Sequence, residues 1–257
     1  MKAIYRLSLI LIALVFDCSS EQESEKNVKP DPVNYVLIVD KSASIDNIDY
    51  QPIITKTLSD RLNSGDMVYL SFIYENSGSA LNQHSFHFVN PGVPNDGFLD
   101  KDMQELQRRK NEKKAKESFL EKISKTISQP KADRRQTAIL DVLIHLEGLQ
   151  NSVVFFLSDM LEQSPKRFMK ANNGEILIDS RDKAIEVANY DYKRLTTDPC
   201  EARKFLKSVK ELIVIAPNSE AMSGLEYEFI PLYWEVMFDS LGFKGEVDFL
   251  SVFDVMN

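Results

Sequence analysis

The sequence predicts an α/β protein whose doubly wound, mainly parallel sheet carries helices on both faces. Short apolar segments of strand length alternate along the chain with segments of helical length, which favours a parallel sheet between two helical layers. The apolar segments are continuous, as is typical of strands that are covered on both faces. Two of them, VLIVD at 36–40 and VVFFLSD at 153–159, end in an aspartate.

The first part of the chain predicts three strands and one helix. The apolar run at 35–39 predicts a buried strand, and the helix expected at 50–63 has three leucine or isoleucine side chains on one face. The run MVYLSFIY predicts a second strand at 67–74. Alternating residues at 85–89 predict a third strand, which we place at the edge of the sheet.

The remaining elements continue the alternation. A long charged helix is expected at about 102–127, and its buried side is marked by Met103, Leu106, Phe119, Ile123 and Ile127. The other expected elements are an apolar helix at 137–147, a strand at 152–159, a helix that begins at Asp198 and Pro199, a strand at 212–218, a helix at about 229–241 and a last strand at 247–253. The chain is therefore expected to end on a strand.

The N-terminal segment predicts export. Lys2 and Arg6 precede a ten-residue apolar run at 7–16, which is too short to span a bilayer but has the length of a signal-peptide core. Cys18 resembles the lipidation cysteine of bacterial lipoproteins, and ordinary cleavage after Ser20 is the alternative. The expected location is a lipoprotein of the cell envelope, in the periplasm or outer membrane, or otherwise a periplasmic or secreted protein.

Composition and charge narrow the function classes. We expect a signal at 1–20, a flexible, charged and proline-bearing tether at 21–33, and one domain at 34–257. The net charge of −8 argues against nucleic acid as a partner and against an electrostatic hold on anionic membranes, so membrane contact is expected only through a lipid on Cys18. Because the chain has only two cysteines, Cys18 and Cys200, no disulfide framework is expected.

The candidate site lies where two buried strands end. In open parallel sheets, ligands bind at the carboxyl ends of the strands, where the strand order reverses. Asp40 and Asp159 each follow such a strand, and the hydroxyls of Ser42 and Ser44 lie in the loop after Asp40. If the two strands are neighbours, these oxygen atoms meet at one site. Hard oxygen donors of this kind suit Mg²⁺.

These residues resemble the von Willebrand factor type A (VWA) domain over about 34–253. Asp40-Lys-Ser42-Ala-Ser44 is similar to the family's D-x-S-x-S signature, and Thr137 and Asp159 match its later threonine and aspartate. The resemblance implies a Rossmann-like VWA fold and a metal-ion-dependent adhesion site made of these five residues. It implies Mg²⁺, or another divalent cation such as Mn²⁺ or Ca²⁺, and a protein partner whose acidic side chain completes the metal's coordination. It implies protein binding, with no enzyme activity.

Departures from the family pattern leave two alternatives open. Lys41 and Ala43 stand where small residues are common, Met160 replaces a frequent glycine, and the family's closing helix is not expected here. One alternative is a degenerate VWA domain that binds protein without metal. The other is a metal-assisted, phosphatase-like hydrolase, which needs a second aspartate two positions after Asp40, where this chain has Ser42.

Overall fold

The computed structural model describes residues 31–41, 49–73, 83–92, 100–128, 137–171, 175–195, 206–216 and 227–256. The chain divides into two compact units, Met1–Asp31 and Pro32–Asn257, and the elements below belong to the second. The predicted signal, most of the tether, Cys18 and Cys200 lie outside the described residues. No helix in the part that is described is long and apolar enough to cross a membrane.

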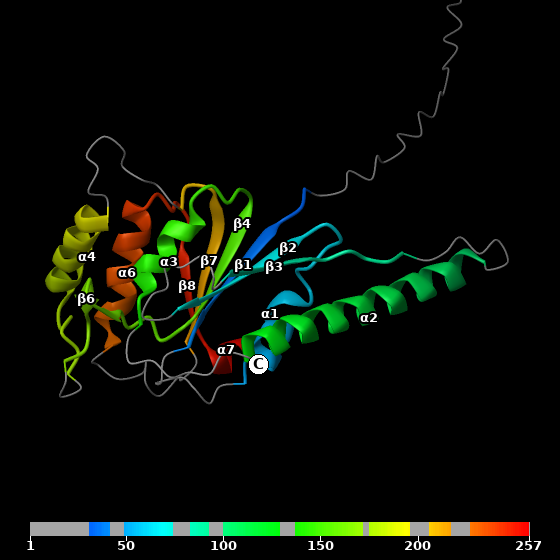
Figure 1. Ribbon diagram of the computed structural model, residues 1–257, viewed down its shortest axis with the longest axis horizontal. Helices are drawn as coiled ribbons and strands as arrows, with labels where there is room; N and C mark the ends of the chain where they lie inside the picture. Colours follow the sequence, from blue (N-terminus) through cyan, green and yellow to red (C-terminus); the bar gives the residue numbers. More distant parts are fainter. Residues whose placement is uncertain are drawn as a thin grey trace, which may run out of the picture. The chain divides into compact units, whose positions relative to one another are not determined.

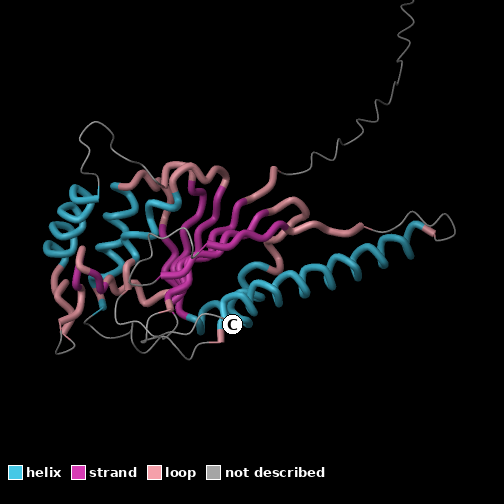
Figure 2. The backbone as a smooth tube through the Cα atoms, in the orientation of Figure 1, coloured by secondary structure: helices cyan, strands magenta, loops and turns pink. Residues whose placement is uncertain are grey.

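Six strands of the described residues form the main sheet, in the order β3-β2-β1-β4-β7-β8. They are β1 (Asn34–Asp40), β2 (Met67–Ile73), β3 (Gln83–His87), β4 (Ser152–Leu157), β7 (Val209–Ala216) and β8 (Val247–Ser251). Neighbouring strands are parallel, except that the edge strand β3 is antiparallel to β2. Counted along the chain, the order is 3-2-1-4-5-6, as in Rossmann-like sheets. The predicted α/β fold class is confirmed (Figure 2).

Helices cover both faces of the sheet (Figure 1). One face carries α1 (Tyr50–Leu58), α2 (Lys101–Ser128) and the short C-terminal α7 (Val252–Met256). The other carries α3 (Ile139–Val142), its 3₁₀ continuation η3 (Leu143–Leu146) and α6 (Phe229–Ser240), with α4 (Arg181–Leu195) packed on α6. A two-stranded hairpin, β5 (Gln163–Ser164) and β6 (Arg167–Phe168), lies between β4 and α4 in the chain.

Alternating side chains of β1 enter two separate hydrophobic cores. Leu37 and Val39 pack in the core beneath α1 and α2, whereas Val36 and Ile38 pack in the core beneath α3 and α6. All four side chains are buried. The continuous apolar run of β1 therefore follows from burial on both faces.

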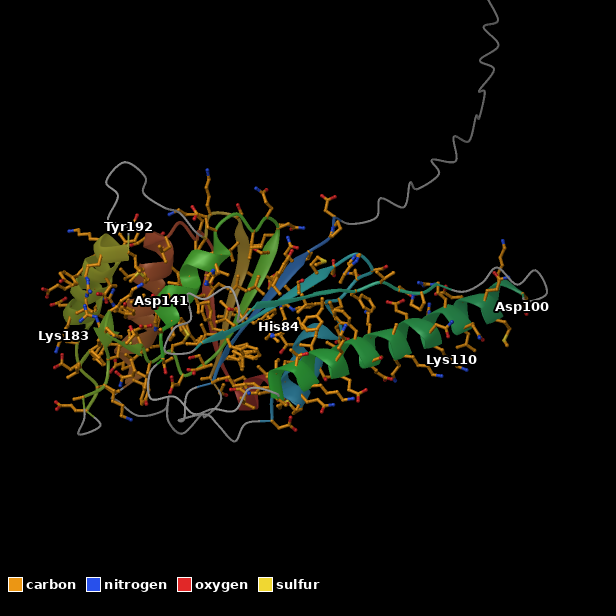
Figure 3. The ribbon with its side chains drawn as sticks, viewed as in Figure 1. His84, Asp100, Lys110, Asp141, Lys183 and Tyr192 are labelled. Atoms are coloured by element: carbon orange, nitrogen blue, oxygen red, sulfur yellow. The ribbon has the colours of Figure 1, made fainter. Side chains whose placement is uncertain are left out.

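The long helix α2 confirms its predicted position, and Ile123 and Ile127 are buried as predicted, but the predicted buried side does not extend into the N-terminal part of the helix. Met103 and Leu106 are 49% and 47% exposed, so the prediction that they face the core is wrong. The fully buried side chains of α2 begin at Leu120. The part of α2 before residue 115 instead carries ion pairs within the helix; in Figure 3, Lys110 labels this part and Asp100 labels the residue just before the helix.

Several boundaries differ from those expected. The first helix ends at Leu58, and the helix predicted at 137–147 is one turn of α-helix followed by the 3₁₀ turn η3. The chain does not end on a strand, because α7 follows β8 directly. The helix α4 and the hairpin β5–β6 were not predicted. The helix expected to begin at Asp198 falls largely outside the described residues.

Replacing Phe156 with alanine should destabilise the protein strongly. Phe156 is fully buried and its ring stacks on that of Phe238, with 5.7 Å between centroids. We expect Phe156→Ala to lower the free energy of unfolding by about 3–5 kcal/mol in urea denaturation. Phe168→Ala is the matched control, because Phe168 is 51% exposed, and it should change stability by about 0.5 kcal/mol or less. Equal effects of the two substitutions would contradict this core.

Candidate functional site

The central strands β1 and β4 are parallel neighbours whose carboxyl ends lie at the same edge of the sheet. Val39 is the register partner of Leu157, so Asp40 and Ser158 come next on the two strands. From β1 the chain passes to β2 on one side, and β4 lies on the other side, so the strand order reverses here. The two strands are neighbours, as the candidate site requires, and this places the candidate site at the ligand-binding position of doubly wound sheets (Figure 1).

Asp40 is fully buried at the end of β1, and its carboxylate is bound by a residue that follows the neighbouring strand β4. The hydroxyl of Ser158 donates a hydrogen bond to Asp40 Oδ2 at 2.9 Å, and Ser158 is itself fully buried. The Tyr50 hydroxyl of α1 donates to the backbone carbonyl of Asp40 at 3.1 Å. Sequence reasoning missed Ser158, although its position one residue before Asp159, level with Asp40, could have indicated it.

Asp159 is half-buried and begins a tightly bonded turn. Its Oδ1 accepts a hydrogen bond from the Leu161 amide at 3.0 Å, while Ser158 Oγ accepts one from the Met160 amide at 2.9 Å. Met160 has a φ of +60° and is fully buried, and its carbonyl accepts a hydrogen bond from Trp234 Nε1 at 2.7 Å. Glycine adopts positive φ without a Cβ clash, so Met160 holds a backbone conformation that ordinarily favours glycine.

Thr137 lies two residues before α3 and is buried. Its amide donates to the Gln163 carbonyl at 3.1 Å, and the Gln163 amide donates to the Thr137 carbonyl at 2.8 Å. This antiparallel bridge joins the segment that enters α3 to the loop that follows Asp159. The described candidate residues are thus linked indirectly: Asp40 binds Ser158, which precedes Asp159, and Thr137 pairs with Gln163, four residues after Asp159.

Glu162 is a fully buried carboxyl group in the same loop, and sequence reasoning missed it. Its Oε2 accepts a hydrogen bond from the Leu140 amide at 2.9 Å, and the Ser164 hydroxyl donates to its Oε1. Burial raises the pKa of Glu162 to about 8, although the hydrogen bonds from Ser164 and from the α3 amides oppose that rise. The sequence carries no local signal for this contact, because the partners are 22 residues apart.

The hairpin that follows Glu162 is held by charged contacts on several sides. The Arg167 guanidinium makes two 2.7 Å hydrogen bonds to the Asp191 carboxylate of α4, and the Tyr233 hydroxyl of α6 donates to the same carboxylate at 2.9 Å. Lys166 forms an ion pair with Asp141 of α3, which is labelled in Figure 3. The loop after β4 is therefore fixed to α3, α4 and α6.

Three further residues named by the sequence are Ser42, Ser44 and Lys41. Ser42 and Ser44 lie outside the described residues. Lys41, whose charge could oppose a metal, has its Nζ 5.2 Å from the centroid of the Tyr50 ring. This cation–π contact is with α1, and the Lys41 amide donates to the Ile73 carbonyl at 3.4 Å.

The donor set at this edge consists of oxygen atoms. No cluster of three or more histidine, cysteine, aspartate or glutamate side chains occurs within the described ranges. A cation here would therefore depend on two carboxylates, those of Asp40 and Asp159, together with hydroxyl groups and water. Oxygen donors with few direct carboxylates fit Mg²⁺, which retains several waters, better than they fit softer transition metals.

Comparisons with known proteins return only distant structural similarity. No protein-family model and no curated protein matches this chain. The human COPII-coat protein Sec24c is 14% identical and has a TM-score of 0.39, with 89% of this chain and 31% of that chain covered. The pilus adhesin SpaC from Lactobacillus rhamnosus GG, in its open conformation, is 12% identical with a TM-score of 0.39, and the coverage is 89% and 29%. This chain spans less than a third of either protein.

The raised pKa of Glu162 predicts a pH-dependent stability. The folded protein keeps the Glu162 proton up to about pH 8, whereas an unperturbed glutamate releases it near 4.5. Because the folded state binds more protons in this window, the free energy of unfolding should fall as the pH rises from about 5 to about 8. Glu162→Gln cannot ionise and should lack this component in urea denaturation across that range.

The exposed Glu246 provides the matched control for this experiment. Glu246→Gln should retain the pH dependence of the wild type. A Glu162→Gln profile with the same slope as the wild type would show that Glu162 does not carry the effect.

Proposed function

We propose that this chain is a non-enzymatic protein-binding module of the VWA type that works in the bacterial cell envelope. The observation that supports it best is the pairing of β1 and β4, because Asp40 ends β1 and accepts a hydrogen bond from the buried Ser158 hydroxyl, which directly precedes Asp159. The D-x-S-x-S sequence begins at the first of these aspartates. Adhesion or assembly, through a divalent cation and an acidic side chain of another protein, is the function that this arrangement favours.

A divalent cation, in this proposal Mg²⁺, is held by Asp40, Ser42, Ser44, Thr137 and Asp159. Hydroxyl ligands leave more positive charge on the ion than carboxylate ligands would, so an incoming carboxylate gains more from binding it. The protein supplies the oxygen donors. The partner supplies the negatively charged ligand.

Binding is favoured over turnover by the residues next to Asp40. A phosphatase-like hydrolase needs a second aspartate at position 42 for general acid catalysis, and this chain has a serine there. The sequence also lacks the G-x-S-x-G motif that presents a nucleophilic serine in many esterases. Neither Ser42 nor Ser44 is accompanied by a sequence motif for its activation.

The proposed location is the cell envelope, with a lipid on Cys18. The support is the apolar run before Cys18 and the charged segment after it.

Removing Asp40 should abolish stabilisation by Mg²⁺. Wild-type protein at a hundredfold excess of Mg²⁺ over its dissociation constant should gain about 2.7 kcal/mol in the free energy of unfolding. Asp40→Ala should gain nothing, because it lacks a ligand, and the measurement is a denaturant titration with Mg²⁺ and with chelator. Asp248→Ala, at an exposed aspartate of β8, is the control and should respond as the wild type does. Equal Mg²⁺ responses in wild type and Asp40→Ala would refute the metal site, and the degenerate alternative would then hold.

Mass spectrometry of the N-terminal peptide tests the lipid anchor. Protein purified from a bacterial membrane fraction should begin at a lipidated Cys18, and Cys18→Ser should lose the lipid. Cys200→Ser changes the only other cysteine and should leave the lipid in place. An unmodified N-terminus at Glu21 would exclude the lipoprotein while leaving export intact.

A further inference from the structure

Two segments at the candidate site are joined by a small number of backbone and side-chain bonds. Thr137 and Gln163 exchange two hydrogen bonds, at 3.1 and 2.8 Å, and the Leu140 amide donates to Glu162 Oε2 at 2.9 Å. One segment carries Thr137 into α3, and the other carries Asp159 away from β4. These contacts therefore fix the backbone of the segment that carries Thr137 against the loop that follows Asp159.

The first turn of α3 depends on Glu162 because the helix lacks a cap of its own. Its N-cap residue is Ala138, which has φ −105° and ψ 72° and makes no side-chain hydrogen bond to the helix. The first amides of a helix need acceptors from outside the helix, normally from a serine, threonine, aspartate or asparagine at the N-cap. Here the amides of Ile139 and Leu140 bond to the Glu162 carboxyl group instead.

The Glu162 side chain is itself fixed in place. The Ser164 hydroxyl donates a hydrogen bond to Glu162 Oε1. The backbone amide of Glu162 donates to the sulfur of Met169 at 3.3 Å. Within the described residues no cation pairs with Glu162, and it is fully buried. A buried carboxyl group needs partners for its polar atoms, and the hydrogen bonds from α3 and Ser164 supply one to each Glu162 oxygen.

We propose that Glu162 is a positioning residue for the metal site, holding the Thr137 segment in register with Asp159. This inference rests on the proposed Mg²⁺-binding function. Glu162 touches no metal in this scheme and acts only through α3 and the Thr137–Gln163 bridge. Residues that orient metal ligands from behind typically alter metal affinity by about 10- to 100-fold when they are replaced.

Three substitutions separate positioning from general support of the fold. Glu162→Leu replaces the carboxyl acceptor with an apolar side chain of similar size. Glu162→Gln keeps a carbonyl oxygen that can accept hydrogen bonds from the α3 amides. Ala138→Ser, added to Glu162→Leu, gives α3 a local cap in place of the distant one. Isothermal titration calorimetry with Mg²⁺ on the purified mature chain measures affinity. Amide hydrogen exchange of residues 137–142 in metal-free protein measures the order of the α3 segment.

Glu162→Leu should weaken Mg²⁺ binding by about 10- to 100-fold and speed exchange at 137–142 before any metal is added. Glu162→Gln should stay close to the wild type, and Ala138→Ser should recover part of the loss. If Glu162→Leu does not fold, Ser164→Ala decides, since it removes only the hydroxyl that holds the Glu162 carboxyl group. A weaker Mg²⁺ affinity in Ser164→Ala supports the inference, and an unchanged affinity contradicts it.

The outcomes also separate this inference from the proposed function. If the wild type binds Mg²⁺ and Glu162→Leu binds it equally well, Glu162 supports only the fold and the inference is wrong. If the wild type binds no Mg²⁺, the proposed function fails, and the positioning role fails with it.

Discussion

Burial of β1 and β4 on both faces is the constraint that places the chemistry of this protein. Side chains along these two strands enter one core or the other, so a polar group is tolerated only where the strand ends or where a partner is provided. Asp40 meets both conditions, because it is the last residue of β1 and the Ser158 hydroxyl donates to it. The reversal of strand order between β2 and β4 brings this end beside the end of β4.

Bonds between distant parts of the chain then fix the loop that leaves β4. Trp234 of α6 binds the Met160 carbonyl, Gln163 pairs with Thr137, and Glu162 binds the α3 amides. Each contact joins this loop to a different helix or to the segment that precedes one. A loop held in this way keeps its shape without a ligand, which is the condition for presenting pre-formed ligands to an ion or a partner.

The sequence predicts those parts of the fold that depend on local composition. The strands at Asn34–Asp40 and Ser152–Leu157 are continuous apolar runs, which the sequence shows directly, whereas their pairing in the sheet was a condition of the predicted site that only the structure establishes. Met103 and Leu106 misled the prediction because helical periodicity does not reveal whether another element lies opposite the apolar face. The helix α4 was missed because its buried side chains are Ala184, Ala188 and Asp191, which give little apolar periodicity.

The site shows the same limit of local information. Asp40 and Asp159 were predictable because each directly follows an apolar run. Glu162 was not, because a glutamate in a loop is ordinarily exposed, and only the fold brings it to an α3 terminus that lacks its own cap. Met160 is intermediate, since its departure from a frequent glycine was visible while its positive φ was not.

In helix α2, the residues that give the helix much of its length are not the residues that pack in the core. Its 28 residues span about 42 Å, yet its fully buried side chains begin only at Leu120, so the part before residue 115 contributes little to the core. Adding or deleting whole turns in that part would move its N-terminal end by about 5.4 Å per turn while leaving the packed half unchanged. Evolution could therefore tune the length of this helix as a spacer, independently of the sheet, the two cores and the edge that carries Asp40.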